Sequence, residues 1–161
     1  MLGNLSLLLR ASLETEGEQE IPLRRELDFL RRYLAIEQAR FGERLRVEES
    51  VEPALLDAHV PTFILQPLVE NAVQHGAGAR AAHGTIAVEA WRDNGNVRLS
   101  VRDNGPGFPA GWSLDDNHGI GITNTRERLR HLYGEQNQSL EISAEPGGGV
   151  RVDLSLPYRS S

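Results

Sequence analysis

The chain has 161 residues, of which 39% are hydrophobic and 25% charged, a size and composition typical of one globular domain with its own core. A formal charge of -6 argues against a general affinity for nucleic acid, and the absence of cysteine excludes disulfides, thiolate metal sites and cysteine nucleophiles. All 17 basic residues are arginine, which excludes a Walker-type phosphate loop with its lysine, and no apolar run approaches the roughly 18 to 20 residues that span a bilayer.

Two leucine-rich segments predict a helical arm over residues 1–44. Residues 2–13 carry leucines at helical spacing, and an acidic, glycine-containing connector follows at residues 14–20. Pro22 suits the first turn of a second helix, whose apolar positions repeat at helical steps: Leu23, Leu27, Leu30, Leu34 and Phe41. This pattern fits either a helical hairpin packed on the domain or an arm for dimerisation or docking. Because the chain opens abruptly in a helix, we expect it to be the carboxy-terminal piece of a longer protein.

The middle of the chain predicts a strand, a buried helix and a hairpin. Residues 45–51 alternate between apolar and polar, as a half-buried strand does. Pro61 is expected to start an apolar helix that runs to about Gly76. Two further alternating runs, residues 85–91 and 97–101, flank an Asn-Gly pair, which predicts an antiparallel hairpin.

The last third predicts a functional loop and the end of the sheet. Residues 103–121 are rich in glycine without usable periodicity, too long for a simple turn. A helix is expected over residues 122–133 with Gly134 as its stop, and strands over residues 140–144 and 150–156. The predicted fold class is α+β: a two-layer α/β sandwich with one mixed or antiparallel sheet, helices on one face, and the helical arm at its N-terminus.

Three groups of residues could carry chemistry. Asn71 and His75 lie four residues apart on one helix, so both can meet a common ligand, and an amide oxygen suits Mg²⁺. They could equally be polar residues at a frayed helix end. Asp103 directly follows a strand, where a carboxylate can accept from an exocyclic amine, although Asp-Asn-Gly is also ordinary turn chemistry.

The third group is a glycine pair where the loop enters a helix. Gly119 and Gly121 could present free backbone N–H groups to an anion, although helix capping alone would also explain them. Arg126, Arg128 and Arg130 follow in that helix, and their spacing prevents all three from facing one phosphate.

The order of these motifs is similar to that in a known superfamily. Residues 67–76, PLVENAVQHG, resemble the N box of histidine kinases. Residues 103–107, DNGPG, and 119–129, GIGITNTRERL, resemble their two glycine boxes. With Gly147-Gly148-Gly149 near the end, these motifs resemble those of the Bergerat-fold GHKL ATPases, which include gyrase, Hsp90 and MutL. The resemblance covers nearly the whole chain and is greatest to LytS-like sensor histidine kinases, including residues 33–41, YLAIEQARF, which are similar to the segment that joins the phosphoacceptor region to the ATP-binding domain.

The resemblance implies a site for ATP and Mg²⁺ in a domain over residues 45–161. Asn71 would hold the metal, with Glu70 or His75 supporting the metal or the phosphates. Asp103 would read the adenine amine, and Gly105 and Gly107 would allow close approach. The implied phosphate-binding residues are Gly119, Gly121, Asn124 and Arg128, and residues 108–118 would form the ATP lid.

Three departures from the family pattern refine this expectation. Pro67 occupies the position of the water-activating glutamate of gyrase and MutL, so efficient ATP hydrolysis is not expected. Val150 stands where a threonine is common in the superfamily. None of the five histidines lies in the family's Asn-Pro-His-Phe-type phosphoacceptor motif, so the acceptor is expected upstream of this sequence.

The resemblance implies the catalytic domain of a two-component sensor histidine kinase. It would pass the γ-phosphoryl group of ATP to an upstream histidine, for relay to the receiver domain of a response regulator, which in LytS-like systems is often of LytTR type. The full-length protein would be a homodimer anchored in the inner membrane with this domain in the cytoplasm, and no nucleic acid would be bound. The alternative functions are a non-catalytic nucleotide-binding regulatory module and an anti-sigma-type serine kinase.

Overall fold

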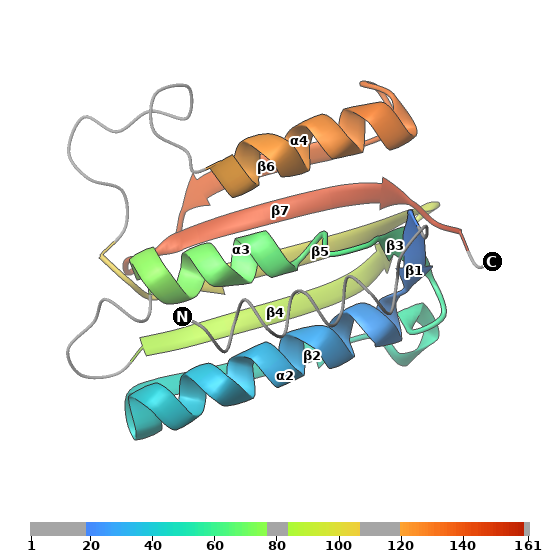
Figure 1. Cartoon of the computed structure of the whole chain (residues 1–161). Coiled ribbons are helices and arrows are strands. Elements are labelled where there is room, and N and C mark those ends of the chain that lie inside the picture. Colours follow the sequence, from blue (N-terminus) through green and yellow to red (C-terminus); the bar gives the residue numbers. More distant parts are fainter. Residues whose placement is uncertain (1–18, 77–83, 107–119, 160–161) are drawn as a thin grey trace.

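The computed structural model describes residues 19–76, 84–106 and 120–159 and shows two layers (Figure 1). One layer is a five-stranded sheet with the strand order β2-β4-β5-β7-β6, in which β2 and β4 are parallel and the other neighbours are antiparallel. The strands are β2 Leu45–Val51, β4 Gly84–Asp93, β5 Asn96–Asp103, β6 Ser139–Ala144 and β7 Val150–Pro157. The second layer consists of the helices α2 Leu23–Phe41, α3 Gln66–Asn71 and α4 Ile120–Tyr133. The predicted α+β sandwich with helices on one face is therefore confirmed.

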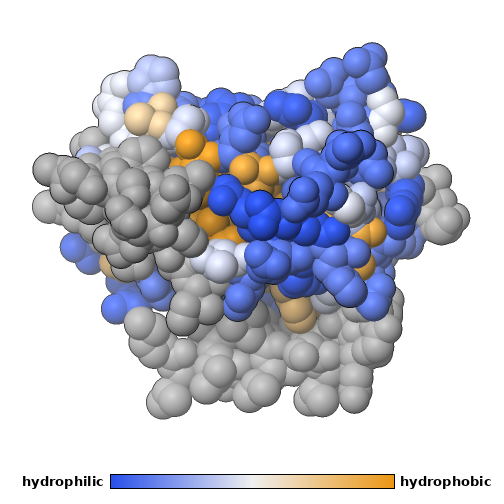
Figure 2. Space-filling view, turned by 90° about the horizontal axis from the view of Figure 1, so that it is seen from above, coloured by the Kyte–Doolittle hydropathy of each residue, from blue (hydrophilic) through white to orange (hydrophobic). Residues whose placement is uncertain are grey.

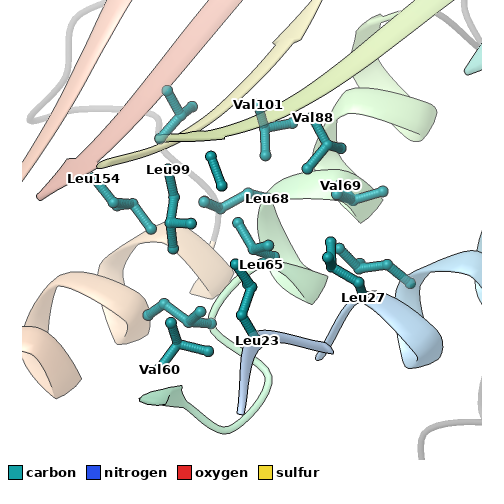
Figure 3. Packing of buried hydrophobic residues seen from close by; sticks show 14 of the residues in the cluster. Leu23, Leu27, Val60, Leu65, Leu68, Val69, Val88, Leu99, Val101 and Leu154 are labelled. Atoms are coloured by element: carbon teal, nitrogen blue, oxygen red, sulfur yellow. The ribbon is translucent and has the colours of Figure 1, made fainter. Parts of the chain in front are cut away.

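The core lies between the helices and the inner face of the sheet. Leu68 and Val69 of α3, and Leu65 just before it, point at the sheet residues Leu99, Val101 and Leu154, and all six side chains are buried (Figure 3). Helix α2 contributes four buried leucines to the same core, all identified by its periodicity: Leu23, Leu27, Leu30 and Leu34. Phe41, the fifth residue of that pattern, is only partly buried. The predicted helix is thus confirmed, although it begins at Leu23 and Pro22 is its N-cap rather than part of its first turn. Residues 2–13 lie outside the described residues.

The opposite face of the sheet is polar and charged. Arg102 pairs with Glu89 at 3.1 Å, and Arg151 pairs with Asp153 at 3.0 Å, along three neighbouring strands. Charged side chains on alternate positions explain the period-2 pattern of these strands, because the helices in the described part of the chain pack against the inner face (Figure 1). The side seen from above is also mainly hydrophilic, with apolar residues showing mostly near its centre (Figure 2).

The predicted turns and helix ends are largely confirmed. Asn94 has a φ of 58°, as the tight turn between β4 and β5 requires, and Gly134 ends α4 with a φ of 80° while its N–H donates to the carbonyl of Arg130. No helix in the described ranges is both long and apolar enough to cross a bilayer.

The expected helix start at Pro61 is wrong. Pro61 ends a short strand, β3 His59–Pro61, which pairs with β1 Glu20–Pro22, and neither strand was predicted. The chain then makes a turn in which Phe63 has a φ of 60°, and α3 begins only at Gln66 with Pro67 in its first turn. The proline at a helix start is therefore Pro67, six residues later than the apolar run suggested.

The two ends of the described chain meet beside α4. The hydroxyl of Tyr133 donates to Glu20 at 2.7 Å, and Arg159 pairs with the same carboxylate at 3.4 Å. The N–H of His59 donates to the carbonyl of Arg159, so the C-terminal segment is joined to the β1–β3 pair as well.

Candidate functional site

Asp103 lies at the end of β5 on the face that points toward the helices. It follows Leu99 and Val101 on that face and pairs with buried Ile86 across the sheet. Asp103 is only 8% exposed, and burial raises the pKa of its carboxyl above the ordinary value. The N–H of Gly105 donates to Oδ1 at 2.8 Å, and the backbone of Val150 also hydrogen-bonds the carboxylate. The side chain is therefore fixed by backbone hydrogen bonds beside buried apolar residues, and its adenine-reading role stays a prediction.

The chain just before β7 lies close against the end of β5. An ideal Cβ on Gly149, at a φ of +105°, would lie 1.9 Å from the carbonyl oxygen of Asp103. Only glycine allows this approach between the chain before β7 and the end of β5. The resemblance singled out the Gly147-Gly148-Gly149 motif, but the contact that makes Gly149 necessary was not predicted.

Asn104 fixes the same strand end to β4. Its Oδ1 accepts the N–H of Thr85 at 2.7 Å, and its own N–H donates to the carbonyl of Thr85 at 3.3 Å. The side chain thus extends the ladder between the strands by one more hydrogen bond, a role that the turn-forming chemistry of asparagine only hinted at.

Replacing Asn104 by alanine should lower the free energy of unfolding by about 1 to 2 kcal/mol, because the Thr85 N–H loses its acceptor at a partly buried position. Asn104→Asp keeps an oxygen at the same place and should retain most of the stability. Urea denaturation of both variants tests this expectation. Parent stability in Asn104→Ala would show that the hydrogen bond contributes nothing.

Helix α3 brings the N-box residues to the same end of the molecule. Asn71 is its last residue and is partly exposed, and a π-helical turn, Ala72–Gly76, continues the chain toward β4 and β5. Turns of this kind often occur at functional sites. Figure 1 shows this end of α3, the end of β5 and the start of α4 on one side of the molecule. His75 lies in the π-helical turn, and its side chain is outside the described parts.

Glu70 is held within the helix layer. The amide of Gln66, one turn earlier, donates to its Oε1 at 3.4 Å. Burial raises the pKa of Glu70, and the nearby carboxylate of Glu37 on α2 raises it further, against the lowering effect of the Gln66 hydrogen bond. Glu70, the neighbour of Asn71 in α3, therefore also interacts electrostatically with α2, and its catalytic role stays a prediction.

Helix α4 carries the remaining phosphate-site candidates. It begins at Ile120, so Gly121 lies in its first turn, as the glycine motif implied. Asn124 is exposed one turn later, while Arg128 is half-buried a further turn along. Burial lowers the pKa of Arg128, and the carboxylate of Glu26 partly offsets this effect. Gly107, Gly119 and residues 108–118, the predicted lid, lie outside the described residues.

Glu26 belongs to none of the sequence motifs, so its place beside the site was not predicted. This residue of α2 is 1% exposed, and burial raises the pKa of its carboxyl to about 7, although backbone hydrogen bonds and Arg128 lower it. A glutamate on the apolar seam, beside Leu27 and Leu30, was the one signal that could have identified it.

Comparison with known proteins identifies the family. Residues 57–160 match the family model described as "Histidine kinase-, DNA gyrase B-, and HSP90-like ATPase", and residues 1–45 match the model "Histidine kinase". The chain belongs to this ATPase family. It contains the catalytic, ATP-binding domain of a sensor histidine kinase, as the motifs implied.

Curated relatives match nearly the whole chain. Sensor protein LytS of Oceanobacillus iheyensis is 35% identical over 99% of this chain, which covers 29% of that protein. Sensor histidine kinase BtsS of Escherichia coli K12 is 32% identical over 96% of this chain, which covers 27% of it. The chain thus spans less than a third of the length of these relatives.

Solved histidine kinase structures share the fold. The histidine kinase domain of the Erythrobacter litoralis EL346 blue-light activated kinase aligns with a TM-score of 0.66 and 21% identity, covering 96% of this chain and 71% of that one. The catalytic domain of histidine kinase ThkA aligns with a TM-score of 0.65 and 18% identity, covering 88% of this chain and 97% of that one. The expected two-layer α+β fold is therefore shared with these structures.

Proposed function

We propose that this chain binds ATP with Mg²⁺ and transfers the γ-phosphoryl group to a histidine on another segment of the longer protein, for relay to a response regulator. The observation that carries the proposal is Asp103, a buried carboxylate on the helix-facing side of a strand end, fixed by backbone hydrogen bonds. Such a carboxylate can accept a hydrogen bond from the exocyclic amine of adenine. The adjacent Gly105 leaves room for a flat ring beside the backbone.

Asn71 is the proposed metal ligand. Within the described ranges no group of three or more His, Cys, Asp or Glu could hold a metal ion. A site with one amide ligand from the protein suits Mg²⁺, because this ion keeps several waters and takes few protein ligands beside the phosphates of its substrate. When bound, the ion stabilises charge on the phosphoryl oxygens. Glu70 and His75 would support it or the phosphates.

The remaining candidates would bind the phosphates. The first turn of α4 directs backbone N–H groups, including that of Gly121, toward the end of the molecule that carries Asp103 and Asn71. Asn124 and Arg128 follow one and two turns later, and Gly107 and Gly119 complete the proposed set. Phosphoryl transfer suits this arrangement, since catalysis rests mainly on positioning and charge stabilisation.

The acceptor is proposed to be a protein side chain. Pro67, at the position of the water-activating glutamate in related ATPases, has no group to deprotonate a water, which disfavours hydrolysis. The five histidines of this sequence lack the phosphoacceptor motif, so the acceptor histidine would come from the upstream region of the protein.

The organisation of the whole protein follows the same proposal. Residues 1–44 would be the end of a dimerisation and phosphotransfer region, joined to the catalytic domain over residues 45–161. Its relatives are named sensor proteins, which supports a cognate response regulator as partner, and the resemblance to LytS-like kinases favours the LytTR type. A membrane-anchored homodimer with this domain in the cytoplasm is the proposed setting.

A thermal-shift experiment with Asp103→Asn tests nucleotide binding. The parent chain should gain about 2.7 kcal/mol of apparent stability in MgADP at a hundredfold excess over its Kd. Asp103→Asn should lose this gain, because its NH₂ group would face the adenine amine with a donor instead of an acceptor. Asp93→Asn, an exposed change at the other end of β4, is the matched control and should behave as the parent.

The full-length protein tests transfer. Incubation with γ-labelled ATP should place label on a histidine in the parent and the Asp93→Asn control, and none in Asp103→Asn. Label on serine of a partner protein would instead support the anti-sigma-type kinase. An absent shift in the parent chain at saturating MgADP would overturn the proposed nucleotide site.

A further inference from the structure

Glu26 joins helix α2 to the start of helix α3. Its Oε1 accepts the N–H of Phe63 at 3.0 Å, and its Oε2 accepts the N–H of Leu65 at 2.8 Å. Leu65 precedes α3 directly and supplies no side-chain cap, and the backbone of Gln66, the first residue of α3, also hydrogen-bonds the Glu26 carboxylate. Both oxygens are therefore engaged by a turn that lies 37 to 39 residues away in sequence.

The turn that Glu26 holds is conformationally strained. Phe63 has a φ of 60°, a region that L-residues other than asparagine, aspartate and glycine rarely occupy. Its ring packs against Phe29 of α2 with ring centroids 5.6 Å apart, and Phe29 lies one turn after Glu26. Helix α2 thus contacts this turn at two points and keeps it in a conformation that it would not adopt alone.

Helix α3 is short enough to transmit this constraint. Its six residues rise by about 9 Å, so Gln66 at its start and Asn71 at its end belong to one rigid segment. Movement of the first turn would therefore move Asn71 and Glu70 relative to Asp103 on the sheet. The guanidinium of Arg128 on α4 attracts the carboxylate of Glu26, so α4 also interacts with this residue.

A buried carboxylate is a costly way to cap a helix. Transfer of an ionisable group from water into a core is unfavourable, and apolar packing would often be more stable. Hydrogen bonds to two specific N–H groups instead define one position of α3 relative to α2.

We propose that Glu26 is a positioning residue, which sets the place of Asn71 and Glu70 through the first turn of α3 and so ties nucleotide affinity to the position of α2. The inference rests on the proposed function, because it assigns a role in the same site. Helix α2 lies within the segment that matches the histidine kinase model, whereas α3 and α4 lie in the ATPase segment. Glu26 therefore connects the two.

The test compares the affinity for MgADP with stability. Glu26→Gln keeps the size of the side chain but presents an NH₂ group to one of the two N–H donors, and it should weaken MgADP binding on the order of tenfold. Glu43→Gln, the same change at an exposed position just after α2, should leave affinity and stability unchanged. Leu156→Val removes core volume at the far end of β7 and should lower stability without changing affinity.

Calorimetric titration and urea denaturation give separate answers. Parent affinity in a folded Glu26→Gln variant would overturn the inference, whereas lack of binding by the parent would instead overturn the proposed function. If Glu26→Gln does not fold, Glu26→Asp decides, because it keeps the charge but withdraws it by one methylene. A folded Glu26→Asp with weakened binding supports the inference; parent affinity in that variant, or its failure to fold as well, would show a purely structural role.

Discussion

Replacing Gly149 by alanine should destabilise the protein by roughly 2 to 4 kcal/mol and abolish nucleotide binding. The added Cβ would lie 1.9 Å from the carbonyl oxygen of Asp103 and 2.9 Å from the Cα of Asn104. These are backbone atoms, so no side-chain rotation relieves the clash, and the end of β5 must move. The estimate combines about 1 kcal/mol for a non-glycine residue at positive φ with the 1 to 3 kcal/mol typical of overpacking.

Gly147→Ala is the matched control for this change. Gly147 belongs to the same turn and has a φ of +88°, but its Cβ would meet no atom within 4 Å. It should therefore lose only about 1 kcal/mol and keep its affinity for MgADP. Urea denaturation and titration with MgADP measure both effects. Equal losses in the two variants would contradict the close approach of Gly149 to Asp103.

Stability should fall as the pH rises from about 5 to 7.5. Burial raises the pKa of Glu26 from 4.5 to about 7, so between these values the folded chain holds a proton that the unfolded chain has released. Stability then decreases with rising pH, because the folded state binds more protons. The contribution is complete below pH 4.5 and is lost above about 7, with a magnitude of roughly 3 kcal/mol.

Glu26→Gln separates this effect from that of other groups. The charged side chain that acts on Glu26 is Arg128, and its hydrogen bonds come from the backbone of Phe63, Leu65 and Gln66. A glutamine cannot ionise, so the variant should show a shallower decline in urea denaturation between pH 5 and 8. A residual slope is expected, since burial raises the pKa of Asp103 and Glu70 in the same direction. An unchanged slope in the variant would refute the prediction.

Local patterns predicted most of the fold because the forces behind them are local. The apolar spacing of α2, the Asn94-Gly95 turn and Gly134 at the end of α4 each depend on residues within a few positions of one another. The resemblance likewise implied one site for Asp103 and Asn71, and the ends of β5 and α3 lie on the same side of the molecule (Figure 1). The boundaries of these elements shift by only a residue or two in the structure.

The start of α3 could not be predicted, since its cause lies elsewhere in the chain. The apolar residues before Gln66 fit a helix as well as a buried turn, and the turn forms because Glu26 accepts its N–H groups and because Pro61 pairs with β1. The contact between Gly149 and Asp103 is also long-range and leaves no spacing to detect. What the sequence concealed in both cases is a partner more than 35 residues away.

The junction of Tyr133, Glu20 and Arg159 has a mechanical consequence. Any pull that reaches the domain along the chain before α2 arrives at Glu20, whose carboxylate is attached to α4 through Tyr133 and to the C-terminal segment through Arg159. The backbone of β1 carries the same load into β3. Tension at this one residue would therefore be shared among three distant parts of the chain.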